Sequence, residues 1–326
     1  MGGVSGRHAD PFSSAMTSYL AGRAGTVTAA VYDVRTGQTW SLGDGQPQAT
    51  ASIVKIDILE TLLAVQPAGL TVADRGLAQS MIENSDNDAA TALWNEAGGP
   101  AGLRSYNVSV GLRQTAPSAC LACAGFPWPG WGLTTTTPAD QVLLLRQLVD
   151  GPLLSRGDRA YVLSLMENVE PGQRWGVSTG VPAGVRVALK NGWVPLTAPG
   201  SDWQINSEGW VSGGGRDYLV AVLATGNPSE QYGIDTLNAL SSGKVNFTIF
   251  QDPYLQGFLP VLYMYLYNLS GGQLAPPDTD TGLTILNKGN VGQFLKNSRF
   301  QGGASAQAYL PRPAGAISQP AATTST

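Results

Sequence analysis

The sequence predicts an α+β fold in which one antiparallel sheet is built from both ends of a domain, with an all-helical segment inserted between them. Three observations support this prediction. The apolar residues alternate with a period of two between residues 25 and 42, follow a helical period over most of residues 52–165, and alternate again from residue 185. Strand segments on both sides of a helical stretch must meet in one sheet to bury their apolar faces.

The first part of the chain is predicted to form a helix and a strand pair. Residues 10–23 have the pattern of an amphipathic helix, and residues 25–32 and 38–42 alternate like two strands joined by a turn at Thr36-Gly37. A second helix begins near Ser52. Residues 77–165 continue with helical periodicity, interrupted by a loop rich in Pro, Gly, Trp and Thr.

The last part of the main domain returns to strands. Residues 185–190, 203–211 and 218–225 have the pattern of three successive antiparallel strands, and the third is entirely apolar, so we expect it at the centre of the sheet. A closing helix is predicted over residues 229–240. The residue pattern then changes around Ser241-Ser242-Gly243-Lys244. A strand-like stretch follows, and after it a predicted Tyr/Leu-rich helix over residues 254–269.

The length of the chain and the changes in its composition predict the domain organisation. A chain of 326 residues has room for about two domains of ordinary size. We divide it into a polar N-terminal stretch (1–9), a main domain (10–243), a shorter C-terminal segment (244–300) and a Pro/Ala/Thr-rich tail that we expect to be disordered (301–326).

Composition excludes several classes of protein. Nineteen basic and 23 acidic side chains give a net charge of −4, without the basic stripe that binds a phosphate backbone, so we expect no nucleic-acid partner. No run of 18 or more apolar residues is present, and we therefore expect no integral membrane segment. The first residues show neither the basic nor the apolar region of a signal peptide.

Metal and thiol chemistry have little support in the sequence. Its one histidine, His8, lies in the polar N-terminal stretch, and its two cysteines, Cys120 and Cys123, lie in the Gly/Pro/Trp-rich loop. A structural zinc site needs four ligands. We therefore expect no metal and no cofactor, and we leave the oxidation state of the cysteine pair open. A nucleophile in this chain needs a base other than histidine.

One serine and one lysine have the spacing of such a nucleophile and base. In Ser52-Ile53-Val54-Lys55 the hydroxyl and the amine are three residues apart, and on a helix they lie on one face of the first turn. A desolvated lysine loses its proton near neutral pH and can activate a serine. The alternative interpretation is a serine N-cap followed by an exposed lysine.

Two further motifs strengthen the catalytic interpretation. Ser85-Asp86-Asn87 precedes a predicted helix and offers a second hydroxyl and an amide, while Lys190-Asn191-Gly192 ends a predicted strand and offers a cation and a close backbone approach. Each has a structural alternative, a helix N-cap for the first and a strand-end turn for the second. The order and the contexts of the three motifs together favour a common site.

The three motifs resemble the S-x-x-K, S-D-N and K-[TS]-G signature of class A β-lactamases and penicillin-binding proteins. The resemblance covers about residues 10–240, and the run of threonines before Pro138 is similar to the segment that follows the omega loop in class A enzymes. The motif Lys190-Asn191-Gly192-Trp193 resembles the corresponding motif in a branch of this family whose members are often labelled serine hydrolases. The resemblance implies a β-lactamase-like antiparallel sheet flanked by N- and C-terminal helices, and a serine hydrolase without a cofactor.

The resemblance also implies roles for individual residues. Ser52 would carry the acyl group, Lys55 would act as its base, and Ser85 would pass a proton to the leaving group. Asn87 would bind the substrate amide, and Lys190, with the adjoining Asn191 and Gly192, its carboxylate. The backbone N–H groups of Ser52 and Trp193 would hold the oxyanion. The acyl donor would be a small molecule or a peptidoglycan peptide.

Two departures from the family pattern bear on the activity. Asn191 replaces the hydroxyl residue of K-[TS]-G, so we expect its amide to substitute for that hydroxyl. Residues 108–139 contain no Asp or Glu, although a class A enzyme carries its deacylating glutamate there. We therefore expect ready acylation and slow release of β-lactams. Peptidase, transpeptidase and esterase activities stay open, as does a pseudoenzyme.

The C-terminal segment resembles another family. Residues 247–257, with the apolar stretch 259–269 and residues 281–286, are similar to the end of a periplasmic sugar-binding protein of an ABC importer, a partial α/β segment. The resemblance implies that Gln251 is a possible sugar contact. Most of the two lobes of such a binder is missing, so we expect a fusion remnant and no independent sugar site; exposed tyrosines there could instead contact a protein partner.

Two functions of different classes follow. The leading one is a serine hydrolase that forms an acyl-enzyme at Ser52 with an amide, ester or β-lactam. The alternative is a carbohydrate-binding or transport-related protein whose hydrolase-like domain is not catalytic. Both parent families work outside the cytoplasm, which implies a secreted or cell-envelope location.

Overall fold

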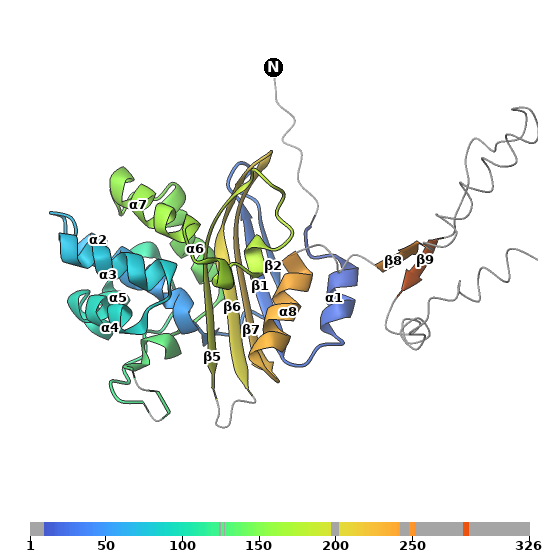
Figure 1. The fold of residues 1–326 in the computed structure, drawn as a ribbon, viewed down its shortest axis with the longest axis horizontal. Coiled ribbons are helices and arrows are strands. Elements are labelled where there is room, and N and C mark those ends of the chain that lie inside the picture. Colours follow the sequence, from blue (N-terminus) through green and yellow to red (C-terminus); the bar gives the residue numbers. More distant parts are fainter. Residues whose placement is uncertain are drawn as a thin grey trace, which may run out of the picture. The chain divides into compact units, whose positions relative to one another are not determined.

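The structure, a computed structural model, is described here for residues 10–123, 125–126, 128–196, 202–241, 248–251 and 283–286. The chain separates into two compact units, Met1–Asn246 and Phe247–Thr326. The described part of the second unit is an antiparallel pair of short strands, β8 (Thr248–Gln251) and β9 (Leu283–Leu286). The first unit contains a five-stranded sheet and the helices around it (Figure 1).

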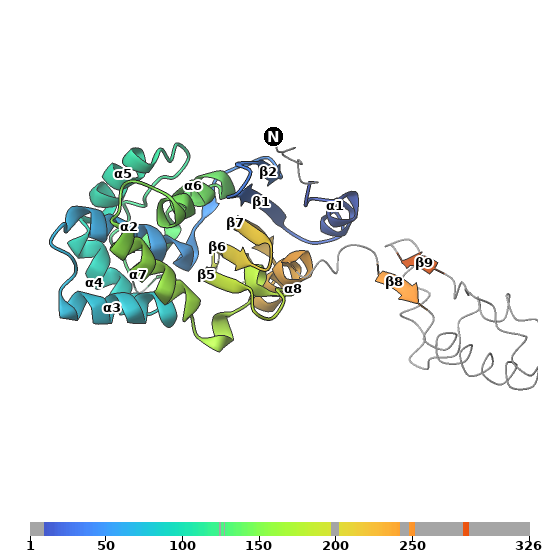
Figure 2. The same ribbon diagram turned by 90° about the horizontal axis from the view of Figure 1, so that it is seen from above.

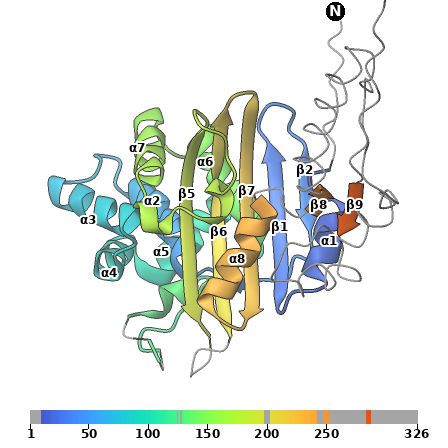
Figure 3. The ribbon, with the colours of Figure 1, turned by 45° about the vertical axis from the view of Figure 1, so that its right-hand side comes forward.

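The sheet of the first unit combines both ends of that unit. Its strands are β1 (Thr26–Asp33), β2 (Thr39–Leu42), β5 (Arg186–Pro195), β6 (Trp203–Gly213) and β7 (Arg216–Asn227). They are arranged in the order β2-β1-β7-β6-β5, and every neighbouring pair is antiparallel (Figure 3). The apolar strand β7 lies at the centre. The predicted α+β arrangement is therefore confirmed.

Helices cover both faces of the sheet (Figure 2). One face carries α1 (Ser14–Leu20) and α8 (Glu230–Ser241), which enclose a small apolar core with Ile205, Val222 and Leu237. The opposite face carries the larger core and the helical segment. That segment consists of α2 (Val54–Val65), α3 (Val72–Glu83), α4 (Asn87–Glu96), α5 (Gly99–Val110), α6 (Pro138–Val149) and α7 (Arg156–Glu167).

Short side chains fix where several of these helices begin. Thr71 and Asp74 form a capping box at the start of α3, and the hydroxyl of Thr137 accepts from the backbone of Asp140 at the start of α6. The connections contain the 3₁₀ turns η1 (Ala51–Ile53), η2 (Gly130–Leu133), η3 (Pro171–Gln173) and η4 (Gly176–Ser178), and the short strand pair β3 (Gln48–Ala49) and β4 (Thr135–Thr136).

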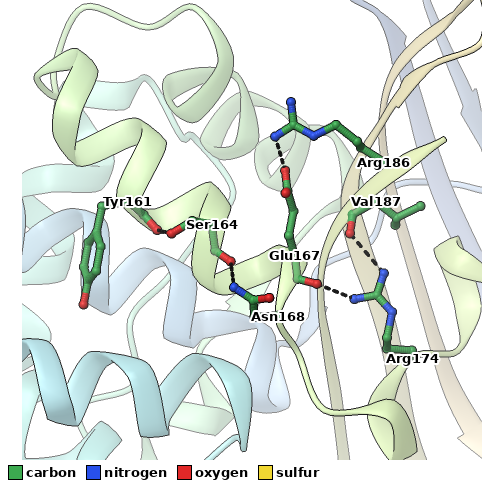
Figure 4. A network of polar contacts seen from close by, with 7 residues as sticks. All are labelled: Tyr161, Ser164, Glu167, Asn168, Arg174, Arg186 and Val187. Carbon is green, nitrogen blue, oxygen red and sulfur yellow. Dashed lines mark hydrogen bonds and ion pairs between the residues drawn. The ribbon is translucent and has the colours of Figure 1, made fainter. Parts of the chain in front are cut away.

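Polar contacts attach α7 to the edge strand β5 (Figure 4). The guanidinium of Arg174 donates to the backbone oxygen of Glu167 (2.9 Å) and to that of Val187 (3.2 Å). The carboxylate of Glu167 forms an ion pair with Arg186 on β5. The β5 edge of the sheet is thereby joined to the helical segment, which lies on the same face as the larger core.

Some sequence predictions need correction, and others fall outside the described residues. The first helix is shorter than the predicted 10–23, because Ser13 caps it and the glycine-containing turn before β1 follows it. The strand predicted over 185–190 continues to Pro195, since its pairing with β6 runs unbroken to Trp203. Lys190-Asn191-Gly192 therefore lies within a strand and not at its end. The predicted helix 254–269 and the tail lie outside the described residues.

The described helices give no candidate for a membrane span: none is both long and apolar enough.

Strand β5 packs very closely against η1. A Cβ atom added at Gly192 would lie 2.6 Å from the backbone nitrogen of Ser52, 2.9 Å from that of Ile53 and 3.0 Å from the backbone oxygen of Thr50. Real Cβ atoms essentially never approach backbone atoms below 3.0 Å. Only glycine allows this contact between the sheet and the start of α2.

We expect Gly192→Ala to push β5 away from η1 and to lower the free energy of unfolding by about 1–3 kcal/mol, the usual cost of overpacking. Gly76→Ala on α3 is the matched control, because nothing lies within 4 Å of its added Cβ. In a helix that change stabilises by up to about 1 kcal/mol. Urea unfolding followed by tryptophan fluorescence measures both, and an unchanged midpoint for Gly192→Ala would contradict the packing argument.

Candidate active site

Ser52 lies in η1, immediately before α2, in a segment that the sheet holds in place. The amide of Asn206 on β6 donates to the backbone oxygens of Ala49 (2.9 Å) and Thr50 (2.8 Å). The backbone nitrogen of Thr50 donates to Thr134 (2.8 Å). Ala51 has a left-handed backbone with φ of 47°, so the chain turns sharply just before Ser52. These contacts orient Ser52, which is half-buried, without using its hydroxyl.

Lys55 is fully buried in the first turn of α2. Its Nζ donates to the backbone oxygen of Ser85 (2.6 Å) and to Oδ1 of Asn87 (2.7 Å), and lies 3.0 Å from Oγ of Ser85. The alternative of an N-cap serine followed by an exposed lysine is therefore wrong. No cap hydrogen bond is formed at the start of α2, and Lys55 reaches the second motif instead.

Lys190 approaches the same hydroxyl from the sheet. Its Nζ donates to Oγ of Ser85 (3.0 Å) and to the backbone oxygen of Asn191 (2.9 Å), and its side chain is fully buried. Ser85 has a left-handed backbone, with φ of 59°, which turns its side chain between the two amines. Asp86 caps α4 by accepting from Ala89 (2.8 Å), so the N-cap interpretation is right for this residue alone.

Burial and charge lower the pKa values of both lysines. Desolvation, followed by the nearby charge of Lys190, lowers the pKa of Lys55 to about 6, against a smaller opposing effect of Asp86. Desolvation lowers the pKa of Lys190 to about 7, while the carboxyls of Glu208 and Glu170 act to raise it. At neutral pH Lys55 is therefore mostly a free amine, which can accept a proton from a hydroxyl.

A cavity opens beside Ser52, with a largely aromatic wall. It is lined by Ser52, Asn87 and Trp193 together with three rings of the loop before β4, Phe126, Trp128 and Trp131. The ring of Trp131 lies with its centroid 5.1 Å from Nζ of Lys55, and its Nε1 donates to Thr91 (3.2 Å). The wall next to the Lys55 amine is therefore an indole.

The cysteine pair stabilises the same loop. Cys120 and Cys123 form a disulfide, which settles in this structure what the sequence left open. The backbone nitrogen of Gly130 donates to Cys120 (2.7 Å), and a Cβ at Gly130 would lie 2.6 Å from Sγ of Cys123. The disulfide thus packs directly behind the stretch that presents Trp131.

One candidate residue is placed differently from the sequence prediction. The Asn191 side chain is fully buried, and its amide nitrogen donates to the backbone oxygens of Gln173 (2.7 Å) and Trp175 (3.0 Å). It cannot also replace the missing hydroxyl toward a substrate carboxylate. The reason is strand alternation, because neighbours on β5 point to opposite faces and Lys190 occupies the site face.

Gln251 ends β8 in the second unit, and its side chain lies outside the described part of the structure. Sequence reasoning missed a group of buried acids around Glu208 on β6, which also contains Asp57 and Glu60 on α2. The spacing of Asp57 and Glu60 on an otherwise apolar helix was the available signal.

Across the described residues no cluster of three or more His, Cys, Asp or Glu could hold a metal ion.

Known proteins similar to this chain include mycobacterial and nocardial relatives. The proposed lipoprotein LppW of Mycobacterium tuberculosis is 33% identical over 217 residues, which cover 63% of this chain and 65% of LppW. The β-lactamase FAR-1 of Nocardia farcinica is 32% identical over 49% of this chain and 45% of its own length. The chain thus spans less than two thirds of these curated relatives.

The fold has close counterparts among solved structures. The TLA-1 extended-spectrum β-lactamase aligns with a TM-score of 0.64 and 15% identity over 72% of this chain and 96% of its own. A β-lactamase from Xanthomonas campestris aligns with a TM-score of 0.60 and 19% identity over 71% of this chain and 95% of its own. At these identities the likeness concerns the fold, and it confirms the predicted β-lactamase-like architecture.

A separate similarity concerns a sugar-binding protein. The xylose/arabinose-binding protein XylF of Sulfolobus acidocaldarius is 36% identical over 107 residues, which cover 33% of this chain and 23% of XylF. The predicted resemblance to a sugar-binding protein is thereby supported for part of the chain.

The family model described as the beta-lactamase enzyme family, Beta-lactamase2, matches residues 60–247, more than half of the chain. The match includes Ser85, Asn87 and Lys190 and begins after Ser52 and Lys55. The chain therefore belongs to the beta-lactamase enzyme family.

Proposed function

We propose that the chain is a serine hydrolase that forms an acyl-enzyme at Ser52 with an amide, ester or β-lactam. The observation that carries the proposal is the convergence of Lys55 and Lys190 on the hydroxyl of Ser85, beside a cavity that exposes Ser52. Family membership supports the same class of reaction. No step needs a cofactor.

In this proposal Lys55 is the general base. Its free amine takes the proton of the Ser52 hydroxyl as the oxygen attacks the carbonyl carbon. Lys55 then returns the proton through Ser85 to the leaving group, whose bond to the carbonyl carbon breaks. The chain of contacts from Lys55 to Ser85 provides the path, since Nζ and Oγ are 3.0 Å apart.

The remaining residues bind and orient the acyl donor. The close packing of Gly192 against Ser52 brings the backbone of β5 alongside η1, which supports an oxyanion site between the N–H groups of Ser52 and Trp193. Asn87 lines the cavity and offers its amide to the substrate, and Lys190 as an ammonium attracts a substrate carboxylate. The acyl donor is a small molecule or a peptidoglycan peptide.

Release of the acyl group is expected to be slow. The described part of the loop before β4 presents Trp131 to the Lys55 amine and contains no acid. Asp140, the acid that follows the threonine run, makes structural hydrogen bonds instead. Its carboxylate accepts from the backbone of Gln114 (2.8 Å) and from the hydroxyl of Thr115 (2.8 Å). The hydrolytic water therefore has no carboxylate base from this loop in the described structure.

We expect a covalent adduct at Ser52 with both a fluorescent penicillin and a fluorophosphonate, detected by intact mass spectrometry. Ser52→Ala should abolish both adducts, and the penicillin adduct should persist for minutes because deacylation lacks its base. Absence of any adduct on the wild-type chain would refute the proposed function. Turnover of a cephalosporin at about 10 per second or faster, typical of efficient enzymes, would refute slow deacylation.

The two lysines predict different pH profiles for two kinds of substrate. Acylation by a neutral ester should rise with pH as Lys55 loses its proton, at about pH 6, and then level off. Acylation by an anionic penicillin should rise in the same way but fall above about pH 7, where Lys190 loses its charge. Stopped-flow acylation rates between pH 5 and pH 9 measure both; identical profiles would contradict these roles.

The location and the second unit extend the proposal. The similarity to LppW, described as a proposed lipoprotein, supports a cell-envelope or secreted location. The similarity to XylF supports the alternative function, sugar binding, yet it covers only 23% of that protein. A site that closes between two lobes cannot be built from so small a part.

We therefore expect no binding of xylose or arabinose to the full chain at millimolar concentrations in isothermal titration calorimetry. A protein contact through the same segment would leave that result unchanged. Saturable binding at or below about 1 mM, corresponding to about −4.1 kcal/mol, would favour the sugar-binding alternative.

A further inference from the structure

Glu208 is a buried acid placed directly opposite Lys190. The two residues are Cα partners in the pairing of β6 with β5, and both side chains are fully buried. Side chains at opposed positions of an antiparallel pair lie on the same face, with Cβ atoms about 4.5–5.5 Å apart. Glu208 therefore points to the face of the sheet that holds Lys55 and Ser85.

Within the described part of the chain, no neutral hydrogen-bonding group satisfies the carboxyl of Glu208. Neither of its oxygens has a hydrogen-bond partner among these residues. The two acids that α2 presents to the same region differ in this respect. Glu60 accepts from the hydroxyl of Tyr106 (2.8 Å), and Asp57 accepts from the amide of Asn107 (2.9 Å).

A buried acid without hydrogen bonds is costly in its ionised form, so it either keeps its proton or has its charge compensated by a cation. Desolvation raises the pKa of Glu208 well above its usual range, Lys190 acts to lower it, and Asp57 adds to the increase. Lys190 is thus the cation that favours the ionised form of Glu208, and it acts through space, because no ion pair joins the two side chains in the described structure. In return the carboxylate favours the ammonium form of Lys190.

We propose that Glu208 is a positioning residue, the buried counter-ion that keeps Lys190 an ammonium while Lys55 stays a free amine. The inference rests on the proposed function, because it assigns the charge states which that reaction requires. It concerns a residue outside the three sequence motifs.

The asymmetry between the two lysines follows from what surrounds each. Lys190 has Glu208 across the strand pair and Glu170 from the loop before η3, and both carboxyls favour its charge. The charge of Lys190 lowers the pKa of Lys55, whereas the carboxylate of Asp86 acts to raise it. Asp86 is exposed and already caps α4, so its effect on Lys55 is screened. Two amines on one hydroxyl thereby take different protonation states.

Loss of the carboxylate should move the two lysines in opposite directions. Without Glu208 the ammonium of Lys190 loses its counter-ion, so its pKa falls. Lys55 then loses a neighbouring positive charge, so its pKa rises. A change that merely loosened and hydrated the site would instead raise both values toward that of an exposed lysine.

The experiment is a pH titration of the full chain labelled with ¹³C at lysine Cε, in which the five lysines of the sequence give five signals. Lys190→Arg and Lys55→Arg assign the two buried ones. Glu208→Gln should lower the Lys190 midpoint by about 1 unit or more, the usual effect of removing an adjacent opposite charge, and raise that of Lys55. Glu60→Gln, a buried acid hydrogen-bonded to Tyr106, is the matched control and should move neither.

Unchanged lysine midpoints in Glu208→Gln, or a rise of both, would overturn the proposal. Glu208→Leu gives a second neutral variant in case the first does not fold, and it must shift the two midpoints in the same directions. The titration needs no substrate, so it tests the counter-ion even if no acyl-enzyme forms.

A kinetic measurement then separates this role from a general loss of structure. At pH 7 Glu208→Gln should raise KM for an anionic penicillin at least several-fold, because less Lys190 is charged. The KM for a neutral ester should stay unchanged, since that substrate has no carboxylate for Lys190. Equal losses for both substrates would contradict the proposal, whereas no acylation of the wild type by either would refute the proposed function instead.

Discussion

Two buried amines that share one hydroxyl are the constraint on which the rest of this structure depends. Lys55 and Lys190 both lie about 3.0 Å from Oγ of Ser85 and have no contact with bulk water. Removing an ammonium group from water costs several kcal/mol unless the surroundings compensate its charge or the group loses its proton, as Lys55 does. The fold provides that compensation with backbone oxygens, with the amide oxygen of Asn87, and with the carboxyls of Glu208 and Glu170.

The architecture explains how three distant stretches of sequence meet at this point. The sheet brings β5 and β6 beside η1, and Asn206 ties the backbone before Ser52 to β6. The left-handed residues Ala51 and Ser85 turn the chain where each motif enters the site. Strain of this kind persists only where the surrounding structure fixes it. Here the fixing groups are hydrogen bonds from the sheet and the loop before β4.

Most of the fold and the main candidate residues followed from the sequence because they depend on local pattern. Period changes predicted the strands and helices, and motif order predicted that Ser85 and Lys190 belong with Lys55. Other features depend on strand register or loop shape, which no local pattern encodes. The opposition of Glu208 to Lys190, the use of the Asn191 amide by the loop before η4, and the position of Trp131 beside Lys55 are of this kind.

The register between β5 and β6 has one further consequence. Shifting β5 by a single residue would exchange Lys190 with Asn191, place an amide among the buried acids and turn the lysine toward the α8 face. Such a chain would keep its helices and most of its sheet but would lose the contact of Lys190 with Ser85 on which the proposed reaction depends. β5 is an edge strand, paired on one side only, so its alignment depends on β6 and on the contacts with α7 and η1. Correct alignment of one strand thus separates a molecule with the proposed site from one of nearly the same shape without it.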